Sequence, residues 1–203
     1  YNGLKDTIEC IESIKKSSAQ SKIIVVDNAS KENEAEIISK RFPEVKAIRS
    51  ETNGGFSAGN NIGIQWALDQ GYDYIALLNN DTVIASDMLE LLCQNASDLS
   101  VSVPKMLYFS RPDVIWYGGG RINRKTGNAE HINMNQKDPG DTTVRKCDFA
   151  TGCCIMVPAS VFQKVGMLDK KYFMYCEDTE FCLRLMEHGI SINYVPSAKL
   201  WHK

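Results

Sequence analysis

The sequence predicts an α/β domain with a largely parallel central sheet flanked by helices, and three observations support this prediction. Residues 74–78 form an unbroken apolar run, which is typical of a strand buried on both faces of a parallel sheet. Strand-like and helix-like segments alternate along the first hundred residues, at the spacing of right-handed βαβ units. A chain of 203 residues is long enough for one such domain with a full core.

Capping and turn residues set the expected bounds of the elements in the first half. Asp6 and Glu9 resemble a capping box, which predicts a first helix that ends near Ser18. Ser30 is expected to cap the next helix, and Gly71 is expected to end the third. The predicted strands are 22–26, 45–49 and 74–78. The helices predicted after the first one are a helix around 37–42, a helix over 57–70 and a helix over 86–95.

The second half is less regular, and its predicted elements depend on shorter patterns. Residues 124–146 are polar, contain Gly127, Pro139 and Gly140, and show no sustained periodicity. We expect a long mobile loop there, of the length that commonly forms a binding loop or a lid. The predicted strands are 101–108, 114–117, 153–157 and 190–195, and the predicted helices are a short one from Pro158 to Gly166 and a second over 177–188.

Composition narrows the classes of function. The formal net charge is −2 with no long basic run, so no nucleic-acid partner is expected. No stretch approaches the roughly 20 apolar residues of a membrane span, and no signal peptide is visible. Seven cysteines, two of them adjacent at 153 and 154, suit no ordinary disulfide framework and favour a reduced, cytoplasmic protein. P-loop, dinucleotide-binding and serine-hydrolase motifs do not occur.

Three polar residues, Asn79, Asn80 and Asp81, directly follow the apolar run 74–78. Open α/β sheets bind ligands beyond the carboxyl ends of their strands, so this is where a ligand or a metal ion would lie. Mg²⁺ and Mn²⁺ prefer oxygen ligands, but one carboxylate with two amides is a thin shell unless a diphosphate adds oxygens. Asn and Asp are also common in turns, so the cluster alone leaves a turn and a metal site both open.

Other acidic residues stand at strand ends or helix starts. Asp27 ends strand 22–26, where an acid either binds a ligand or stabilises a turn. Glu177 and Asp178 open a helix, whose dipole favours ionised carboxylates. A carboxylate held there is either a general base or simply a complement to the dipole, and both interpretations remain open.

The three histidines are interpreted differently. His202 follows the last predicted strand and is a candidate third metal ligand, although a lone histidine more commonly has a structural role. His131 in the polar segment and His188 at a helix end are interpreted as structural.

Six motifs in order resemble the family 2 glycosyltransferases, in particular the bacterial branch associated with rhamnosyl transfer. They span nearly the whole chain, and together they are far more specific than any one of them. The motifs are Tyr1-Asn2; Val25-Val26-Asp27-Asn28-Ala29-Ser30; Asn53-Gly54-Gly55-Phe56-Ser57-Ala58-Gly59-Asn60-Asn61-x-Gly63; Leu77-Leu78-Asn79-Asn80-Asp81-Thr82; Gly166-Met167-Leu168-Asp169-x-x-Tyr172-Phe173-x-Tyr175-x-Glu177-Asp178-x-Glu180-x-Cys182-x-Arg184; and Tyr194-Val195-Pro196 with His202.

The resemblance implies a GT-A type fold in which residues 1–203 form a single domain, with a nucleotide-binding half (1–100) and an acceptor and catalytic half (101–203). It implies inverting transfer of a sugar, assisted by Mg²⁺ or Mn²⁺, from a nucleotide-diphospho-sugar donor to a hydroxyl acceptor. The implied setting is bacterial cell-surface polysaccharide synthesis. A saccharide or lipid-linked saccharide is the implied acceptor, which is compatible with peripheral contact at the inner face of the cell membrane.

The resemblance also assigns roles to residues. Asp178 matches the catalytic base, with Glu177 as its neighbour, and Asp81 matches the acid that remains in the metal-binding motif. His202 matches a histidine that completes the metal or diphosphate site. The residues implied in nucleotide and donor binding are Tyr1, Asn2, Asp27, Asn53, Gly55, Phe56, Gly59, Asn60 and Asn80.

Three features depart from the family pattern. The family's first strand would precede Tyr1, Asn79 replaces the first acid of the metal motif, and the chain stops just after His202, so we expect a fragment of a longer protein. These departures favour the alternative of a non-catalytic sugar-nucleotide-binding domain, whereas the intact pair Glu177 and Asp178 argues against it. A nucleotidyltransferase is a third interpretation.

Overall fold

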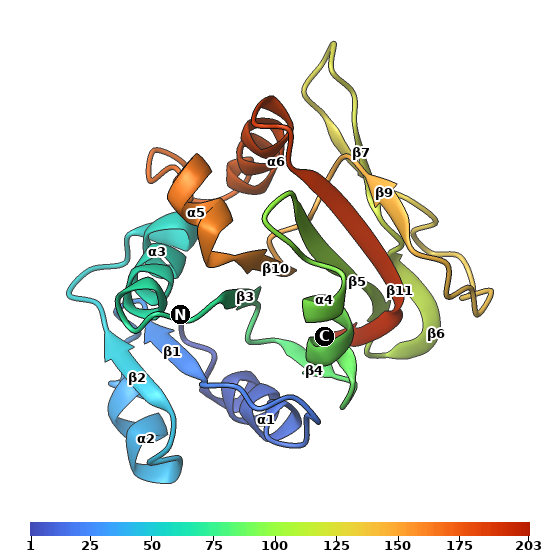
Figure 1. Cartoon of the computed structure of the whole chain (residues 1–203). Helices are drawn as coiled ribbons and strands as arrows, with labels where there is room; N and C mark the ends of the chain where they lie inside the picture. Colours follow the sequence, from blue (N-terminus) through green and yellow to red (C-terminus); the bar gives the residue numbers. More distant parts are fainter.

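The structure, a computed structural model, describes residues 1–203 as an α/β fold with six helices and eleven strands (Figure 1). The helices are α1 (Leu4–Ile14), α2 (Glu34–Arg41), α3 (Gly55–Asp69), α4 (Met88–Gln94), α5 (Ala159–Val165) and α6 (Glu177–Glu187). The strands are β1 (Ile24–Asp27), β2 (Lys46–Arg49), β3 (Tyr74–Leu78), β4 (Thr82–Ile84), β5 (Ser100–Tyr108), β6 (Arg111–Tyr117), β7 (Gly120–Ile122), β8 (Ala129–His131), β9 (Arg145–Cys147), β10 (Cys154–Pro158) and β11 (Ser191–His202).

The strands form three sheets. The central one has seven strands, in the order β3-β10-β5-β11-β4, with β6 added beside β5 and β9 beside β11. β1 and β2 form a separate parallel pair, and β7 and β8 form a small hairpin. α3 contacts both β1 and β3 and thereby bridges the first two sheets. The predicted α/β class is confirmed.

The prediction of a mostly parallel sheet is wrong for the central sheet. β1 with β2 and β5 with β11 are parallel, whereas β3, β4, β6 and β9 each pair antiparallel with a neighbour. Only Phe109 and Ser110 separate β5 from β6, and a connection this short can form a hairpin but not a parallel crossover. The βαβ spacing used in the prediction occurs only in the first half.

The predicted capping box at the start of the first helix is wrong. α1 begins at Leu4, two residues before Asp6, and Gly3 precedes it without a side-chain cap. The Thr7 hydroxyl instead donates to the Gly3 carbonyl oxygen over 2.9 Å. A side-chain bond within the first turn thus takes the place of the predicted capping box.

The second helix is also capped differently from the prediction. Asn33 precedes α2, and its side chain accepts a hydrogen bond from the Glu36 N–H over 3.2 Å. Ser30 is engaged elsewhere, because its N–H donates to Asp27 Oδ1 and its hydroxyl oxygen accepts from the Asn2 N–H, both over 2.8 Å. Ser30 therefore stabilises the end of β1 and does not cap α2.

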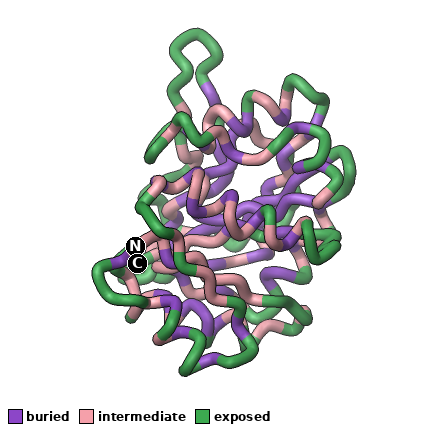
Figure 2. The backbone as a smooth tube through the Cα atoms, turned by 90° about the vertical axis from the view of Figure 1, so that its left-hand side faces the viewer, coloured by how far each residue is buried: buried purple, intermediate pink, exposed green.

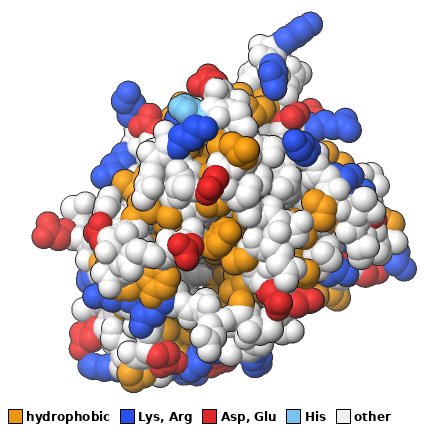
Figure 3. Space-filling view, viewed as in Figure 1, with side chains coloured by type: hydrophobic (Ala, Val, Ile, Leu, Met, Phe, Trp, Pro, Cys, Tyr) orange, Lys and Arg blue, Asp and Glu red, His pale blue; other side chains and the backbone are white.

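β3 is not buried on both faces, although its apolar run predicts this. Tyr74 is 42% exposed, whereas Ile75 and Leu77 are buried. One edge of β3 pairs with β10, and its other side faces a cavity of about 800 Å³ that β1 also lines. Figure 3 shows a hollow near the centre of this face, with hydrophobic side chains around it.

Residues 124–146 are more ordered than the predicted loop. They contain β8, β9 and a segment that lies along β6, where the Ile115 N–H donates to the Gln136 carbonyl oxygen. Asp138 anchors this segment: its carboxylate lies 2.6 Å from Lys105 Nζ and 3.6 Å from Lys199 Nζ. The tip of the β7–β8 hairpin projects as an exposed loop, at the top of Figure 2, and residues 139–144 form a second, largely exposed stretch without secondary structure. Hydrophobic periodicity does not predict such a segment, because the contacts that hold it are made with residues far away in the sequence.

Two hydrophobic cores stabilise the fold. The larger has 34 buried residues and surrounds the central sheet, and the smaller consists of Ile11, Ile38, Phe42 and Val45 between α1, α2 and β2. Figure 2 shows the buried residues, in purple, concentrated in the interior of the molecule, and the exposed residues, in green, mainly in its outer loops. No helix is long and apolar enough to cross a membrane.

Asp138→Asn is expected to destabilise the fold by about 3 kcal/mol, because it leaves the buried Lys105 ammonium without its charge partner. Urea-induced unfolding measures this loss. Asp113→Asn is the control, because the Asp113–Lys137 pair spans 3.9 Å between exposed side chains and should matter by less than about 0.5 kcal/mol. Equal losses in the two variants would contradict the buried-pair argument.

The same pair should make stability fall in acid. Burial raises the pKa of Asp138, but the hydrogen bonds from Lys105 and from the Gly140 N–H outweigh it and lower the pKa overall. The stabilisation is therefore complete above the unfolded-state pKa of about 3.9 and is lost as the pH falls through the lower folded-state value. Asp138→Asn should flatten this part of the stability profile.

Candidate functional site

The sequence-predicted acids meet beyond the carboxyl end of β3. The Asn79 N–H donates to the Cys153 carbonyl oxygen over 2.8 Å, and the neighbouring Gly152 N–H donates to Asp178 Oδ2 over 3.1 Å. These two backbone contacts bring the end of β3, the start of β10 and the start of α6 together. Asp81 follows Asn79 by two residues, and Asp178 binds the residue before Cys153, so the two acids flank the same junction although they are almost a hundred residues apart in sequence.

His202 reaches this site because of strand register. β11 pairs antiparallel with β4, and His202 lies opposite Thr82, the residue after Asp81. His202 Nε2 is 3.5 Å from Asp81 Oδ2. The hydrogen bond from His202 lowers the pKa of Asp81, and it outweighs burial, which raises it. Asp81 is therefore a carboxylate at neutral pH.

The Asp81 carboxylate fits a divalent cation. Its Oδ1 atom is buried and has no hydrogen-bond partner, which is costly for a carboxylate unless a cation or a ligand donor is present. Oxygen and imidazole nitrogen are suitable donors for Mn²⁺, and Mg²⁺ accepts one or two protein carboxylates. No cluster of three His, Cys, Asp or Glu side chains exists to hold a metal ion, so the chain supplies at most part of a shell.

Asp178 is presented at the start of α6 by an unusual backbone. Tyr175 and Cys176, the two residues before the helix, both adopt left-handed conformations, with φ of 72° and 70°. Asp178 Oδ1 accepts a hydrogen bond from the Thr179 N–H over 2.8 Å. Donated N–H groups fix the Asp178 carboxylate, and its side chain remains partly exposed.

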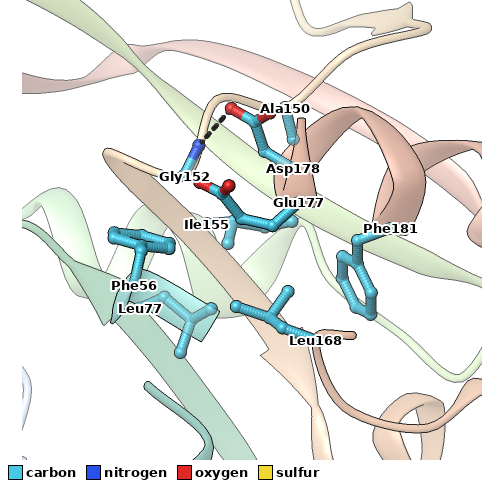
Figure 4. Close-up of a pocket in the computed structure, with 9 residues that line it drawn as sticks. All are labelled: Phe56, Leu77, Ala150, Gly152, Ile155, Leu168, Glu177, Asp178 and Phe181. Atoms are coloured by element: carbon cyan, nitrogen blue, oxygen red, sulfur yellow. Dashed lines mark hydrogen bonds between the residues drawn. The ribbon is translucent and has the colours of Figure 1, made fainter. Parts of the chain in front are cut away.

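Glu177, the neighbour of Asp178, has a different environment. It is 6% exposed, its Oε2 atom has no hydrogen-bond partner, and burial raises the pKa of its carboxyl group. Figure 4 shows Glu177 among apolar side chains around a cavity of about 10 Å³, with Asp178 turned toward Gly152. The two adjacent acids therefore differ in environment: the Asp178 side chain is partly exposed, and the Glu177 side chain is buried.

The segment that starts α3 is held by the protein's own contacts. The Asn53 side chain accepts from the Gly55 N–H over 3.0 Å, and the Phe56 N–H donates to the Phe173 carbonyl oxygen over 2.7 Å. The Asn60 side-chain amide donates to the Phe56 carbonyl oxygen, four residues earlier in the same helix. The tip of the Phe56 ring lies against Gly152, where an added Cβ atom would be 3.0 Å from its Cζ, and Phe56 lines the small cavity of Figure 4 together with Asp178.

Asn28 is a site residue that the sequence interpretation did not single out. Its amide nitrogen donates to Asn53 Oδ1 and to the Gly55 carbonyl oxygen, both over 2.9 Å, and thus ties the end of β1 to the start of α3. A Cβ atom at Gly59 would lie 3.2 Å from this amide, so Gly59 leaves room for it. The signal was available, because Asn28 stands in the same motif as Asp27.

Asp27 is buried, and both of its carboxylate oxygens have partners. Ser30 binds one oxygen, and Arg49 Nη1 binds the other over 2.6 Å. Burial raises the pKa of Asp27, but the Ser30 hydrogen bonds and Arg49 lower it overall. Arg49, at the end of β2, is a second residue that the sequence interpretation missed.

The N-terminal residues close the same end of the site. Asn80 donates from its amide to the Gly3 carbonyl oxygen over 3.2 Å and to Thr7 Oγ1 over 3.0 Å, so it anchors the start of α1. Asn2 has φ of 53° and accepts a hydrogen bond from the Lys31 N–H, whereas Tyr1 is 59% exposed.

The large cavity gathers most of the predicted donor-binding residues. Its lining includes Tyr1, Asp27, Asn53, Gly55, Phe56, Gly59, Asn60, Asn80 and Asp81. The lining does not include His202, Glu177 or Asp178. The predicted residues therefore form a group in the large cavity, the pair Glu177 and Asp178 at the start of α6, and His202 at the end of β11. Phe56 lines both the large cavity and the small cavity beside α6, and His202 lies beside Asp81.

Comparison with solved structures places the fold among the GT-A type glycosyltransferases. GalNAc-T7, in a crystal structure with UDP, GalNAc and Mn²⁺, has a TM-score of 0.78 at 16% identity, and the match covers 97% of this chain and 40% of that one. TarS of S. aureus, residues 1–349, has a TM-score of 0.66 at 15% identity, with 100% and 58% covered.

The sequence comparisons identify the family. The profile of glycosyl transferase family 2 matches residues 1–166, and the chain belongs to that family. It is 30% identical over 183 residues to the low-salt glycan biosynthesis hexosyltransferase Agl10 of Haloferax volcanii, with 86% of this chain and 56% of the relative covered. It is 28% identical over 184 residues to the dTDP-rhamnosyl transferase RfbF of Shigella flexneri, with 89% and 59% covered.

A further relative shares more of its length with this chain. The rhamnosyltransferase WbbL of Escherichia coli K12 is 29% identical over 227 residues, with 99% of this chain and 80% of the relative covered. By contrast, the chain spans little more than half the length of Agl10 and RfbF.

Gly55→Ala is expected to destabilise the site segment more than an ordinary left-handed glycine would. Gly55 has φ of +82°, and an added Cβ atom would lie 2.1 Å from the Phe173 carbonyl oxygen. Gly71→Ala is the control, because Gly71 has φ of +75° and nothing within 4 Å of an added Cβ. The control should cost about 1–2 kcal/mol and Gly55→Ala clearly more, as measured by urea unfolding. Equal losses would show that the contact with Phe173 adjusts freely.

Proposed function

We propose that this chain is the donor-binding and catalytic domain of an inverting glycosyltransferase that uses a nucleotide-diphospho-sugar. The observation that carries the proposal is the presence of two carboxylates of different character around the junction of β3, β10 and α6. Asp81 has a buried oxygen without a partner beside His202, and Asp178 is held by N–H groups but stays accessible. The first suits the diphosphate and its cation, and the second suits a general base.

The donor half of the proposed site is residues 1–100, and the acceptor and catalytic half is residues 101–203. The cavity beside β1 takes the nucleotide, with Tyr1, Asp27 and Asn53 of its lining toward the nucleoside and Asn60 and Asn80 toward the donor sugar and diphosphate. Asn2 adjoins the nucleoside end through its hydrogen bond to Ser30. Because Ser30 and Arg49 already bind both oxygens of Asp27, a nucleobase would have to share that carboxylate with them.

Asp81 and His202 would hold a Mg²⁺ or Mn²⁺ ion together with donor phosphate oxygens. Such an ion stabilises the negative charge that the departing diphosphate acquires. The chain's contribution is to keep Asp81 ionised and to fix His202 through the β4–β11 register. Because Asn79 carries no charge, a large share of the binding energy would come from the donor itself.

Asp178 would remove the proton of the acceptor hydroxyl as that oxygen attacks the anomeric carbon. The new carbon–oxygen bond forms while the bond to the diphosphate breaks, the proton goes to Asp178, and the nucleoside diphosphate leaves with the electron pair. A single displacement of this kind inverts the configuration, and no second carboxylate is needed as a nucleophile. Glu177 is the poorer candidate because its carboxyl group is enclosed and its pKa is raised.

The acceptor is expected to be a saccharide or a lipid-linked saccharide. Related proteins are named as a dTDP-rhamnosyl transferase and as N-acetylglucosaminyl-diphospho-decaprenol L-rhamnosyltransferases, the latter from Mycobacterium tuberculosis, 25% identical over 201 residues. A hexose or rhamnose is accordingly the proposed sugar, and cell-surface polysaccharide is the proposed product. A lipid-linked acceptor would bring this domain to the inner face of the cell membrane from the cytoplasm.

Asp178→Asn is expected to lower the transfer rate by about 10²–10⁴-fold, the usual contribution of a positioned general base, while donor binding persists. Release of nucleoside diphosphate measures transfer, and calorimetry measures donor binding. Glu187→Gln, at the exposed far end of α6, is the control and should keep the full rate. Transfer at the parent rate by Asp178→Asn would remove this residue from the mechanism. Donor binding without turnover in the parent protein would instead favour a binding domain.

Asp81→Ala is expected to abolish the dependence of nucleotide affinity on Mn²⁺, because it removes the only carboxylate beside His202. Calorimetric titration with UDP and dTDP, each with and without Mn²⁺, measures the effect. Asp87→Ala removes an exposed acid six residues later, and should preserve the Mn²⁺ dependence. An unchanged Mn²⁺ dependence in Asp81→Ala would show that the metal lies elsewhere.

A further inference from the structure

A row of aromatic rings connects the two functional ends of the proposed site. The Trp116 ring lies 4.3 Å from the His202 ring, centroid to centroid, at an interplanar angle of 32°. His131 meets the edge of Trp116 at 4.7 Å and lies stacked on Phe149 at 6.0 Å. Phe149 begins the short segment that leads to Gly152, whose N–H binds Asp178. The row therefore runs from the neighbour of Asp81 to the loop that holds Asp178.

Trp116 lies at an irregularity in the pairing of β6 with β5. Ile115 pairs with Leu107 and Tyr117 with Met106, so Trp116 has no residue opposite it, and a bulge of this kind re-aims a side chain. Ile115 and Tyr117 are buried, whereas Trp116 remains partly exposed with its ring against His202. None of the rings that form the row lines the large donor cavity. Trp116 and His131 thus present aromatic surface on a part of the site that the donor-binding residues leave unused.

Backbone contacts hold His131 rigidly in place. His131 pairs with Gly120 across the β7–β8 hairpin, and the next residue, Ile132, exchanges backbone hydrogen bonds with residues 118 and 119. Asn133 and Asn135, with φ of 57° and 65°, turn the chain back along β6. His131 therefore lies in strand β8 and not in a loop, which departs from the loop predicted over residues 124–146.

The hydrogen bonding of His131 defines what it presents. Its Nδ1 atom is 3.1 Å from the Trp116 carbonyl oxygen, and a carbonyl only accepts, so Nδ1 carries the proton. Burial lowers the pKa of His131, and the ring is therefore neutral at neutral pH. Nε2 is then an acceptor, and no donor from the chain binds it. A ligand hydroxyl is a suitable partner.

We propose that Trp116 and His131 form the binding subsite for the acceptor sugar, with the Trp116 ring against an apolar face of the pyranose and His131 Nε2 accepting from one of its hydroxyls. Pyranose rings carry C–H groups on their faces and hydroxyls at their edges, and ligand sites match such molecules with aromatic walls and a few placed polar atoms. The attacking hydroxyl must reach Asp178, and the row ends at the loop that holds Asp178. This inference rests on the proposed transferase function and names where its acceptor binds.

The three tryptophans make the subsite directly observable, because Trp66→Phe and Trp201→Phe together leave Trp116 as the sole indole. Titration of this variant with the octyl glycosides of glucose, N-acetylglucosamine and rhamnose, with UDP or dTDP and Mn²⁺ present, should change its emission saturably for at least one glycoside. Emission that stays constant with all three would overturn the subsite. This measurement needs no turnover, so it is independent of whether nucleoside diphosphate release supports the proposed transfer reaction.

Kinetic variants separate a subsite from a purely structural cluster. His131→Ala and Trp116→Phe should raise the acceptor KM by about three- to tenfold, the effect of losing one such contact, and leave nucleotide affinity unchanged. His188→Ala is the matched control, because His188 also places Nδ1 beside a carbonyl oxygen, 2.9 Å from that of Arg184, but at the exposed end of α6. An unchanged acceptor KM in both test variants, or equal losses of acceptor and nucleotide binding, would contradict the proposal.

Discussion

The pairing of β11 with β5 and β4 is the interaction on which the site depends most. β11 runs parallel to β5 along nearly its whole length and antiparallel to β4 at its end, with a register shift between Val195 and Lys199. The final register sets His202 opposite Thr82 and beside Trp116. A slip of one residue would turn His202 to the other face of the sheet and separate it from Asp81. The metal-binding and acceptor parts of the site thus share one structural determinant.

The site also shows how one strand end can hold carboxylates of different chemical character. Asp81 and Asp178 accept hydrogen bonds or face an imidazole, whereas Glu177 is enclosed by apolar groups. Environment rather than residue type therefore separates the accessible base from its neighbour. Tyr175 and Cys176, which precede α6, both adopt the left-handed backbone conformation. Non-glycine residues seldom adopt this conformation, so the arrangement carries local backbone strain.

The sequence predicts well those features that depend on local pattern. The helix over 57–70, the strand over 45–49 and the strand over 74–78 correspond closely to α3, β2 and β3. It fails where distant partners decide. Ser30 serves Asp27 and Asn2 instead of capping a helix, and the order of residues 124–146 comes from Lys105 and β6. The roles of Arg49, Asn28 and His131 likewise follow from contacts that no local periodicity records.

The separation of the two cores explains why the proposed donor site lies where it does. The small core of Ile11, Ile38, Phe42 and Val45 belongs to the β1–β2 part, and the large core belongs to the central sheet. Between them, β1 and β3 both border the large cavity, and α3 is the element that contacts both strands. β1 pairs only with β2 and β3 only with β10, and the cavity between them is lined mainly by hydrophobic residues. The polar residues at the carboxyl ends of β1 and β3 remain open to a nucleotide, because ligands bind beyond strand ends and not between paired strands.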